Sequence, residues 1–375
     1  MIIKQLLLNN FRNYESGCWQ FSNGINILYG ENGQGKTNIL ESIYFCAFGS
    51  SHRTFQEADL INIDGNNMSV ATNFLSIDID KKITLKKDGK KQRKEIILDY
   101  DKIKPRELIG QLKVIMFSPE DLQLIKNDPA TRRRFLDMEI SQIDNKYCFS
   151  LAKYNKILQH RNKLLLEIRE KSANEYMLDV WDEQLANEAA YLLEQRLKNL
   201  DILTQLFSQI YSSIAENSES VSLIYKRKEN NGDNLITLEQ DVDYIDWYKD
   251  SLKERRNKDI DRALTGIGLH RDDILFTINE KPIKSYGSQG QQRTFILALK
   301  IAEIQLIKKQ CGQYPILLLD DVMSELDMKR RKNLLDFLSG KVQTFITVTD
   351  KESIESFTQA KYYKVDKGNI IEELS

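Results

Sequence analysis

The sequence predicts an α/β fold that is built from both ends of the chain, with a mostly helical lobe inserted between them. A glycine-rich segment at residues 30–37 and an apolar segment that ends in two carboxylates at residues 315–321 are typical of one kind of site, yet they lie far apart. Apolar residues at helical spacing dominate much of the intervening chain. We therefore expect one head formed by residues 1–120 and 265–375, and an inserted lobe formed by residues 121–264.

The composition is that of a globular protein with room for two or three domains, because 41% of its 375 residues are hydrophobic and 29% are charged. The net charge is −1, so any surface for a polyanion must be a local patch. The four cysteines are widely spaced, which argues against a zinc site or a disulfide framework. The apolar N-terminus is too short for a signal peptide and no apolar run approaches a membrane span, so we expect a cytoplasmic protein.

The segment from Gly30 to Thr37 matches the pattern G-x-x-x-x-G-K-[ST], in which backbone N–H groups line a concavity for phosphate oxygens. A buried strand is predicted before it at 25–29, and a helix after it at 38–48 whose N-terminal dipole faces the phosphates. Lys36 is expected to reach the β- and γ-phosphates, and the Thr37 hydroxyl to hold Mg²⁺. A chance glycine-rich turn is the alternative. The residues of this segment expected to bind a nucleotide are Gly30, Glu31, Asn32, Gly33, Gln34, Gly35, Lys36, Thr37 and Asn38.

A strongly basic hairpin is predicted from two strands at 74–87 and 92–100, joined around the turn dipeptide Asp88-Gly89. A run of positive charge is either a solvated face or a patch for a phosphate backbone, and the sequence leaves both readings open. The cationic residues of this hairpin are Lys81, Lys82, Lys86, Lys87, Lys90, Lys91, Arg93 and Lys94.

The inserted lobe is predicted to contain an antiparallel helical pair with charged outer faces, at residues 131–168 and 177–214. This pair is too short for a long coiled-coil arm. A strand at 221–226 and a helix at 241–262 complete the lobe, and a strand at 274–278 begins the second part of the head.

Residues 315–321 read Pro-Ile-Leu-Leu-Leu-Asp-Asp, which predicts a buried strand whose carboxyl end carries two acids. In a parallel sheet this end opens into the ligand crevice beside the phosphate-binding loop. Asp320 is expected to hold Mg²⁺, and Asp321 to orient or deprotonate the attacking water. The alternative is an ordinary acidic turn, which the complete phosphate-binding motif disfavours.

A second candidate for phosphate binding precedes a predicted helix at 294–308, where residues 286–293 read Tyr-Gly-Ser-Gln-Gly-Gln-Gln-Arg. Because one phosphate-binding loop already serves a site, this signature segment could bind the γ-phosphate of a nucleotide held by another copy. The alternative is a serine-capped helix start. The turn at 324–327 could cross the same subunit boundary.

Taken together, these motifs resemble the ABC-type ATPase heads of the SMC and double-strand-break-repair family. Stretches spread over nearly the whole chain are similar to the bacterial recombination mediators of that family. They are residues 10–14 (Asn-Phe-Arg-Asn-Tyr), 117–122 (Phe-Ser-Pro-Glu-Asp-Leu), 132–137 (Arg-Arg-Arg-Phe-Leu-Asp), 270–273 (His-Arg-Asp-Asp) and 288–294 (Ser-Gln-Gly-Gln-Gln-Arg-Thr).

The resemblance implies ATP and Mg²⁺ as cofactors and an ATP-dependent homodimer that encloses two nucleotides. It implies a weak, DNA-stimulated ATPase in which Lys36 and Asp321 are catalytic and Ser288 acts in trans. Arg12 would lie near the nucleotide, and Ser288 and Gly290 would reach the γ-phosphate on the other copy.

The resemblance also implies a role in recombinational repair, the SOS response and replication-fork maintenance. The closed dimer would grip duplex DNA beside a single-stranded gap and, with RecR and RecO, direct RecA onto it; hydrolysis would release the DNA. No membrane partner is implied.

Three positions depart from the family pattern. Asp321 stands where related heads often have Glu, and Thr349 stands where they often have a switch histidine. Both differences fit slow turnover. The aspartate is a shorter base that needs closer placement, and the threonine cannot carry the positive charge of an imidazolium. Leu269 stands where the family usually has a proline, directly before His270. A lone histidine such as His270 more often has a structural role than a catalytic one.

Two other functions remain as alternatives, namely the energy-converting subunit of a membrane transporter and a structural clamp of the long-armed SMC kind.

Overall fold

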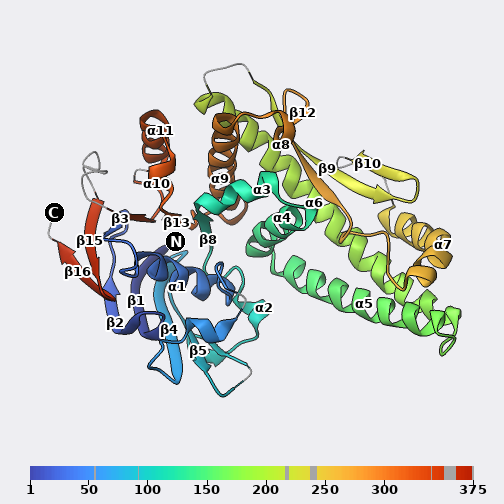
Figure 1. The fold of residues 1–375 in the computed structure, drawn as a ribbon, viewed down its shortest axis with the longest axis horizontal. Coiled ribbons are helices and arrows are strands. Elements are labelled where there is room, and N and C mark those ends of the chain that lie inside the picture. The colour runs from blue at the N-terminus through green and yellow to red at the C-terminus, as the bar shows by residue number, and fades with distance from the viewer. Residues whose placement is uncertain are drawn as a thin grey trace. The chain divides into compact units, whose positions relative to one another are not determined.

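The computed structural model describes residues 1–375 except 55, 92, 216–218, 237–242, 339, 350–359 and 374–375. These residues form two compact units, the first made of 1–121 with 299–375 and the second of 122–298 (Figure 1). None of the helices described in these ranges is long and apolar enough to cross a membrane.

The first unit joins the two ends of the chain in one six-stranded sheet with the order β16-β15-β3-β14-β13-β8. Its strands β3 (Ile25–Tyr29), β14 (Thr344–Val348) and β13 (Ile316–Asp320) run parallel, and β15 (Ala360–Asp366) runs parallel to β3 on the other side. At the edges lie β8 (Val114–Phe117) and β16 (Asn369–Glu373). The predicted α/β head assembled from both ends is thereby confirmed.

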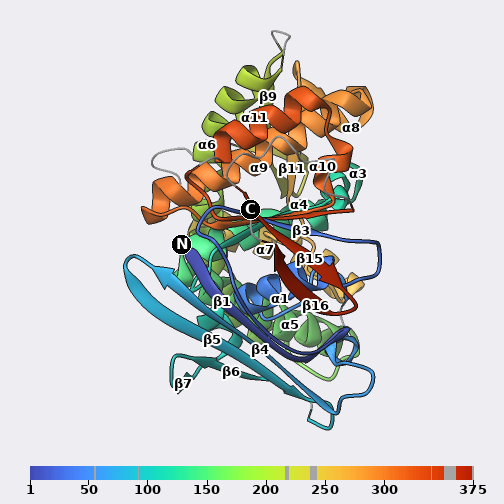
Figure 2. The same cartoon turned by 90° about the vertical axis from the view of Figure 1, so that its left-hand side faces the viewer.

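A second, antiparallel sheet of the first unit has the order β2-β1-β4-β5-β6-β7 (Figure 2). The bounds are β1 Ile2–Phe11, β2 Tyr14–Gln20, β4 Asn67–Ser76, β5 Ile79–Asp88, β6 Glu95–Leu98 and β7 Asp101–Lys102. The strand predicted over 74–87 is therefore two strands. They meet at Ile77 and Asp78, both at positive φ, as a tight hairpin turn requires.

Helix α1 (Lys36–Phe48) contacts strands of both sheets, and this explains why it is apolar on nearly every side. Ile39, Leu40, Ile43 and Phe45 are each fully buried. Short elements complete this unit: η1 Glu57–Leu60, α2 Pro105–Leu108, η2 Pro119–Leu122, α10 Val322–Glu325 and α11 Met328–Leu338.

The second unit contains the predicted helical pair, α5 (Asn145–Arg169) packed on α6 (Leu178–Ile214). It also holds a four-stranded sheet with the order β10-β9-β11-β12. The remaining bounds are α3 Gln123–Lys126, α4 Pro129–Ile143, η3 Glu175–Met177, β9 Val221–Glu229, β10 Gly232–Ile236, α7 Tyr244–Arg262, β11 Asp273–Ile278, β12 Lys281–Pro282, α8 Ile283–Tyr286 and α9 Gln289–Cys311.

The predicted lobe boundary at residue 264 differs from the structure, where residues 265–298 belong to the second unit. The reason is strand pairing. Strand β11 was expected to open the second part of the head, but it pairs antiparallel with β9, from Asp273 opposite Lys226 to Ile278 opposite Val221. The boundary falls inside α9 instead. At the first boundary, prediction and structure differ by a single residue.

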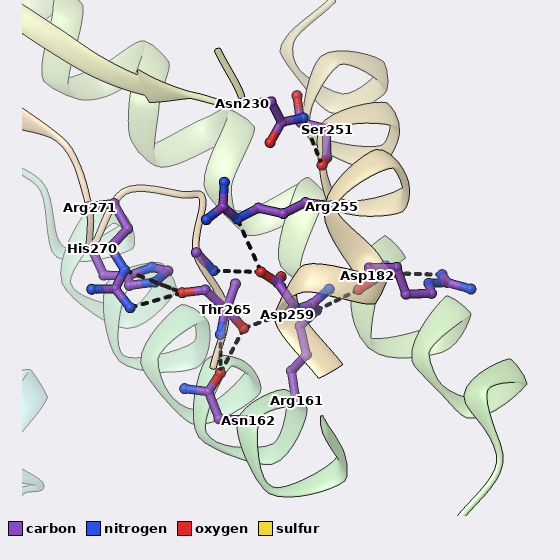
Figure 3. Close-up of polar contacts among 12 residues, drawn as sticks. Arg161, Asn162, Asp182, Asn230, Ser251, Arg255, Asp259, Thr265, His270 and Arg271 are labelled. Atoms are coloured by element: carbon purple, nitrogen blue, oxygen red, sulfur yellow. Dashed lines mark hydrogen bonds and ion pairs between the residues drawn. The ribbon is translucent and has the colours of Figure 1, made fainter. Parts of the chain in front are cut away.

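Three helices of the second unit are tied together by a buried arginine (Figure 3). Arg161 of α5 is 0% exposed; its Nε donates to Asp182 of α6 at 2.6 Å and its Nη1 donates to Asp259 of α7 at 2.9 Å. The same Nη1 donates to the Thr265 hydroxyl at 2.8 Å. Removal of Arg161 would leave each of these two carboxylates with one cation fewer, Asp182 with Arg256 and Asp259 with Arg255.

His270 has a structural role in the same unit. Its Nε2 lies 3.0 Å from the Thr265 carbonyl, to which it donates, and its Nδ1 lies 2.8 Å from the Tyr154 hydroxyl, from which it accepts. In this arrangement the ring is neutral, which burial favours, whereas a protonated Nδ1 would have to donate to the Tyr154 hydroxyl. Burial is the main cause that lowers the pKa of His270 from 6.5 to about 4.

We predict that His270 makes the protein less stable as the pH falls. The unfolded chain binds this proton near pH 6.5 and the folded one only near pH 4, so stability present above pH 6.5 is lost below it. Between pH 7.5 and pH 5 the loss is about 2 kcal/mol. Urea unfolding at the two pH values should show a smaller pH dependence for His270→Gln, but not for His160→Gln, which alters an exposed histidine. Equal pH dependence in His270→Gln and the wild type would contradict the prediction.

Candidate nucleotide-binding site

The glycine-rich loop connects the end of β3 to the start of α1, as the sequence predicts. Gly30 has φ 149° and Gly35 has φ 116°, values that side-chain-bearing residues rarely adopt. Space is also restricted, since a Cβ on Gly30 would lie 2.4 Å from the Val365 carbonyl oxygen and one on Gly35 would lie 2.7 Å from Asn13 Nδ2. Both glycines are therefore required for this loop conformation. Glu31, Asn32 and Gly33 are exposed at its tip.

Lys36 lies over this loop rather than pointing into solvent. Its Nζ donates to the carbonyl of Gly30 at 2.5 Å and to that of Glu31 at 2.8 Å, and the residue is 8% exposed. Burial lowers the pKa of Lys36, while the nearby carboxylates of Asp321 and Asp320 raise it. The ammonium is thus held beside the loop amides, within reach of a phosphate bound there.

Thr37 and Asp320 come together although they are 283 residues apart. The Thr37 hydroxyl donates to Asp320 Oδ1 at 2.9 Å, because β3 and β13 are both neighbours of β14 in the parallel sheet. A hydroxyl and a carboxylate are oxygen donors of the kind Mg²⁺ prefers, and here they are side by side. This pair therefore fits the cation that the sequence predicts at these two residues.

Thr347, which the sequence analysis did not single out, connects the two acids. Its hydroxyl donates to Asp320 Oδ1 at 2.8 Å and accepts from the backbone N–H of Asp321 at 2.9 Å. Asp321 has φ 52°, an uncommon value for a non-glycine residue, and is exposed. The available signal was a buried threonine near the carboxyl end of the otherwise largely apolar strand β14.

The loop is supported by turns from both ends of the chain. Asn13 Nδ2 donates to the Gln34 carbonyl at 2.9 Å and the Tyr14 hydroxyl donates to the Gly35 carbonyl at 3.1 Å. From the C-terminal hairpin, the Lys367 N–H donates to Gln34 Oε1 at 2.7 Å. Asn38 Nδ2 donates to Asn13 Oδ1 at 2.8 Å. Gln34 and Asn38 thus hold the loop in place through their own side chains.

Arg12 pairs with an acid of α1, and each of its three side-chain nitrogens donates one hydrogen bond. Its Nε and Nη2 donate to the two oxygens of Glu41 at 2.9 and 2.7 Å, and its Nη1 donates to the Asp59 carbonyl at 2.8 Å. Burial alone would raise the pKa of Glu41, but hydrogen bonds from Arg12 and Ser51 hold it below its usual value. Glu41 was also missed in the sequence, where a lone acid within an apolar helix was the available signal.

The signature segment forms a helix cap in the second unit. The Ser288 N–H donates to Gln291 Oε1 at 2.7 Å, and the Gln291 N–H donates to Ser288 Oγ at 3.2 Å. This reciprocal pair is a capping box at the start of α9, which is the alternative that the sequence left open. The Ser288 hydroxyl proton takes no part in it, and Ser288 is exposed. Gly290 lies within the first turn of the helix.

A parallel sheet that brings a glycine-rich phosphate loop, its lysine and a strand-end aspartate together defines a P-loop ATPase head of the ABC type. A family model described as the RecF/RecN/SMC N terminal domain matches residues 2–371. The chain belongs to the RecF family of DNA replication and repair proteins.

Curated relatives support this assignment over their full length. The chain is 43% identical to the DNA replication and repair protein RecF of Alkaliphilus oremlandii and 42% identical to that of Clostridium acetobutylicum, with 99% of this chain and 100% of each relative covered. The solved structure of the recombination mediator protein RecF-ATP in the RecFOR pathway is 34% identical, with a TM-score of 0.91 over 100% of this chain and 98% of that one. An Smc head bound to the C-winged helix domain of ScpA is 16% identical and shares the fold, with a TM-score of 0.59.

We predict that Gly35→Ala weakens ATP binding about tenfold or more, because a strained residue costs about 1–3 kcal/mol and its Cβ would meet Asn13. Titration of a fluorescent ATP analogue measures the affinity, and the melting temperature shows that the variant is folded.

Gly24→Ala is the matched control, since a Cβ there meets nothing within 4 Å. Wild-type affinity in Gly35→Ala would show that the loop does not need this conformation to bind a nucleotide.

Proposed function

We propose that this protein is an ATP-dependent DNA-binding protein of recombinational repair, in which ATP closes a homodimer on DNA and slow hydrolysis releases it. The observation that carries the proposal is the hydrogen bond between Thr37 and Asp320, which joins the phosphate loop of one chain end to the acidic strand of the other. Related structures described as RecF-ATP and RecF-ATPrS support ATP as the nucleotide.

In the proposed mechanism the loop amides and Lys36 hold the β- and γ-phosphates. Lys36 exchanges the carbonyls of Gly30 and Glu31 for phosphate oxygens, which are stronger acceptors for an ammonium. Thr37 and Asp320 would hold Mg²⁺, which supplies positive charge to the transferring phosphoryl group. Asp321 orients or deprotonates the attacking water, and Ser288 and Gly290 of another copy complete the γ-phosphate site.

Slow turnover follows from the residues at the strand ends. Asp321 has a shorter side chain than glutamate, so it must approach the attacking water more closely. Thr349, which is exposed after β14, offers a hydroxyl but no positive charge. In such a slow ATPase the rate of hydrolysis sets how long the dimer stays closed. We propose that DNA increases this rate.

The proposed partners of this protein are gapped DNA and the proteins RecR and RecO. The proposed location is the cytoplasm. The name of the RecFOR pathway in related structures supports the two protein partners. Several cations of the predicted basic hairpin are engaged within the protein, since Lys87 and Lys94 pair with Glu57 and Lys91 pairs with Asp88. These three lysines are therefore less available to a phosphate backbone than the other cations of the hairpin.

The full-length similarity to RecF proteins favours repair over the transporter subunit and over the long-armed structural clamp. The helical pair α5 and α6 comprises 25 and 37 residues, which is short for such arms.

We predict that ATP converts a monomer into a dimer, and that both Lys36→Ala and Ser288→Arg prevent the conversion. Lys36→Ala removes the ammonium that holds the phosphates, and Ser288→Arg places a bulky cation where the second copy's γ-phosphate should fit. Light scattering with and without ATP measures the mass of each variant.

Dimerisation of Ser288→Arg with ATP would show that the signature segment is only a helix cap. A wild type that stays monomeric with saturating ATP would contradict the ATP-closed dimer itself.

A further inference from the structure

The second unit contains a basic pocket that lies outside the nucleotide site, with a volume of about 480 Å³. Its walls come from α7, from strands β9, β10 and β11, from the loop between α7 and β11, and from the first residue of α4. Five cationic side chains and two carboxylates line it, so the lining carries a surplus of positive charge. The charged residues of the basic pocket are Lys226, Lys228, Arg255, Arg262, Arg271, Asp233 and Asp273.

The two carboxylates do not balance these cations. Asp233 accepts from both Lys226 at 2.7 Å and Lys228 at 2.9 Å, so one acid serves two ammonium groups. Asp273 accepts two hydrogen bonds from Arg132, at 2.8 and 3.0 Å, and thereby compensates an arginine outside the lining. The three arginines of the basic pocket are left without a carboxylate from the lining.

Arg255 is held in position by buried groups (Figure 3). Its Nε donates to Asp259 Oδ1 at 3.1 Å, and the same oxygen accepts from the Gly266 N–H at 3.1 Å. A Cβ on Gly266 would lie 2.2 Å from that Nε, so a glycine is needed for the arginine to pass the backbone. The two terminal nitrogens of Arg255 make no hydrogen bond with any described residue. They are fixed donors without an acceptor.

Arg271 and Arg262 add further donors. Arg271 donates from Nε and Nη2 to one neutral acceptor, the Thr265 carbonyl, at 3.3 and 3.2 Å (Figure 3). This leaves its charge uncompensated and its Nη1 unused. Arg262 is exposed and, within the described part of the chain, makes no hydrogen bond or ion pair. Guanidinium groups arranged in this way match phosphate oxygens, which accept two parallel N–H bonds.

We propose that the basic pocket binds a backbone phosphate of the DNA. The inference rests on the proposed DNA-binding function and assigns it a specific contact in the second unit. A phosphodiester brings the negative charge that the pocket lacks, and binding releases counterions from the DNA, which makes the affinity depend on salt. The contact carries no base information, so it positions DNA of any sequence.

The test is the affinity of the full-length protein with ATP for a gapped duplex, measured by fluorescence anisotropy over a range of salt concentrations. Arg262→Gln should weaken binding and make the slope of log K against log salt shallower by about 0.9, the value of one lost phosphate contact. Arg262→Lys keeps the charge and should keep most of the slope. Lys253→Gln, on an exposed position of the same helix outside the pocket, should behave as the wild type.

Three results would overturn the proposal. One is an Arg262→Gln variant with the wild-type affinity and slope, and another is an equal loss in Lys253→Gln. The third is an Arg262→Gln variant that no longer binds inorganic phosphate or poly-L-glutamate but still binds DNA as the wild type does. The pocket would then bind small or peptide anions rather than DNA. A wild type that binds no DNA would instead contradict the proposed function, so the two failures can be told apart.

Discussion

The nucleotide site depends on the parallel pairing of β3 with strands from the other end of the chain. Residues 25–29 pair with 344–348 on one side and with 360–364 on the other. This pairing fixes the direction in which the phosphate loop leaves the sheet. It also brings the end of β13 close enough for Asp320 to accept from Thr37. A head made from two distant segments therefore has a site only when the sheet between them has formed.

Local sequence predicted the parts of the site whose chemistry is local. The glycine pattern before Lys36 requires positive φ, and Gly30, Gly33 and Gly35 all have it. The apolar strand before Asp320 could be recognised because a buried parallel strand is apolar on both faces. The helical pair in the insertion followed from its periodicity. In each case the residues that specify the feature are neighbours in sequence.

The remaining features depend on pairing between distant residues, which periodicity does not report. The sequence of β11 is compatible with a strand of the head sheet and equally with a partner of β9. Its pairing with β9 is visible only in the folded structure. Thr347 is one hydroxyl in an apolar strand, and its contact with both acids arises from the register of β14 against β13. The pair between Arg12 and Glu41 joins residues 29 positions apart, and its two hydrogen bonds depend on how strand β1 packs on α1.

The order of the strands has a consequence for synthesis on the ribosome. The phosphate-loop strand emerges early, but its two sheet neighbours are among the last segments to be translated. At about 5–20 residues per second the interval is on the order of tens of seconds, during which the apolar strand β3 lacks both of its sheet neighbours. The second unit contains its own sheet and helical pair and can fold in that interval. Nascent chains should therefore acquire protease resistance in the second unit before they do so around the phosphate loop.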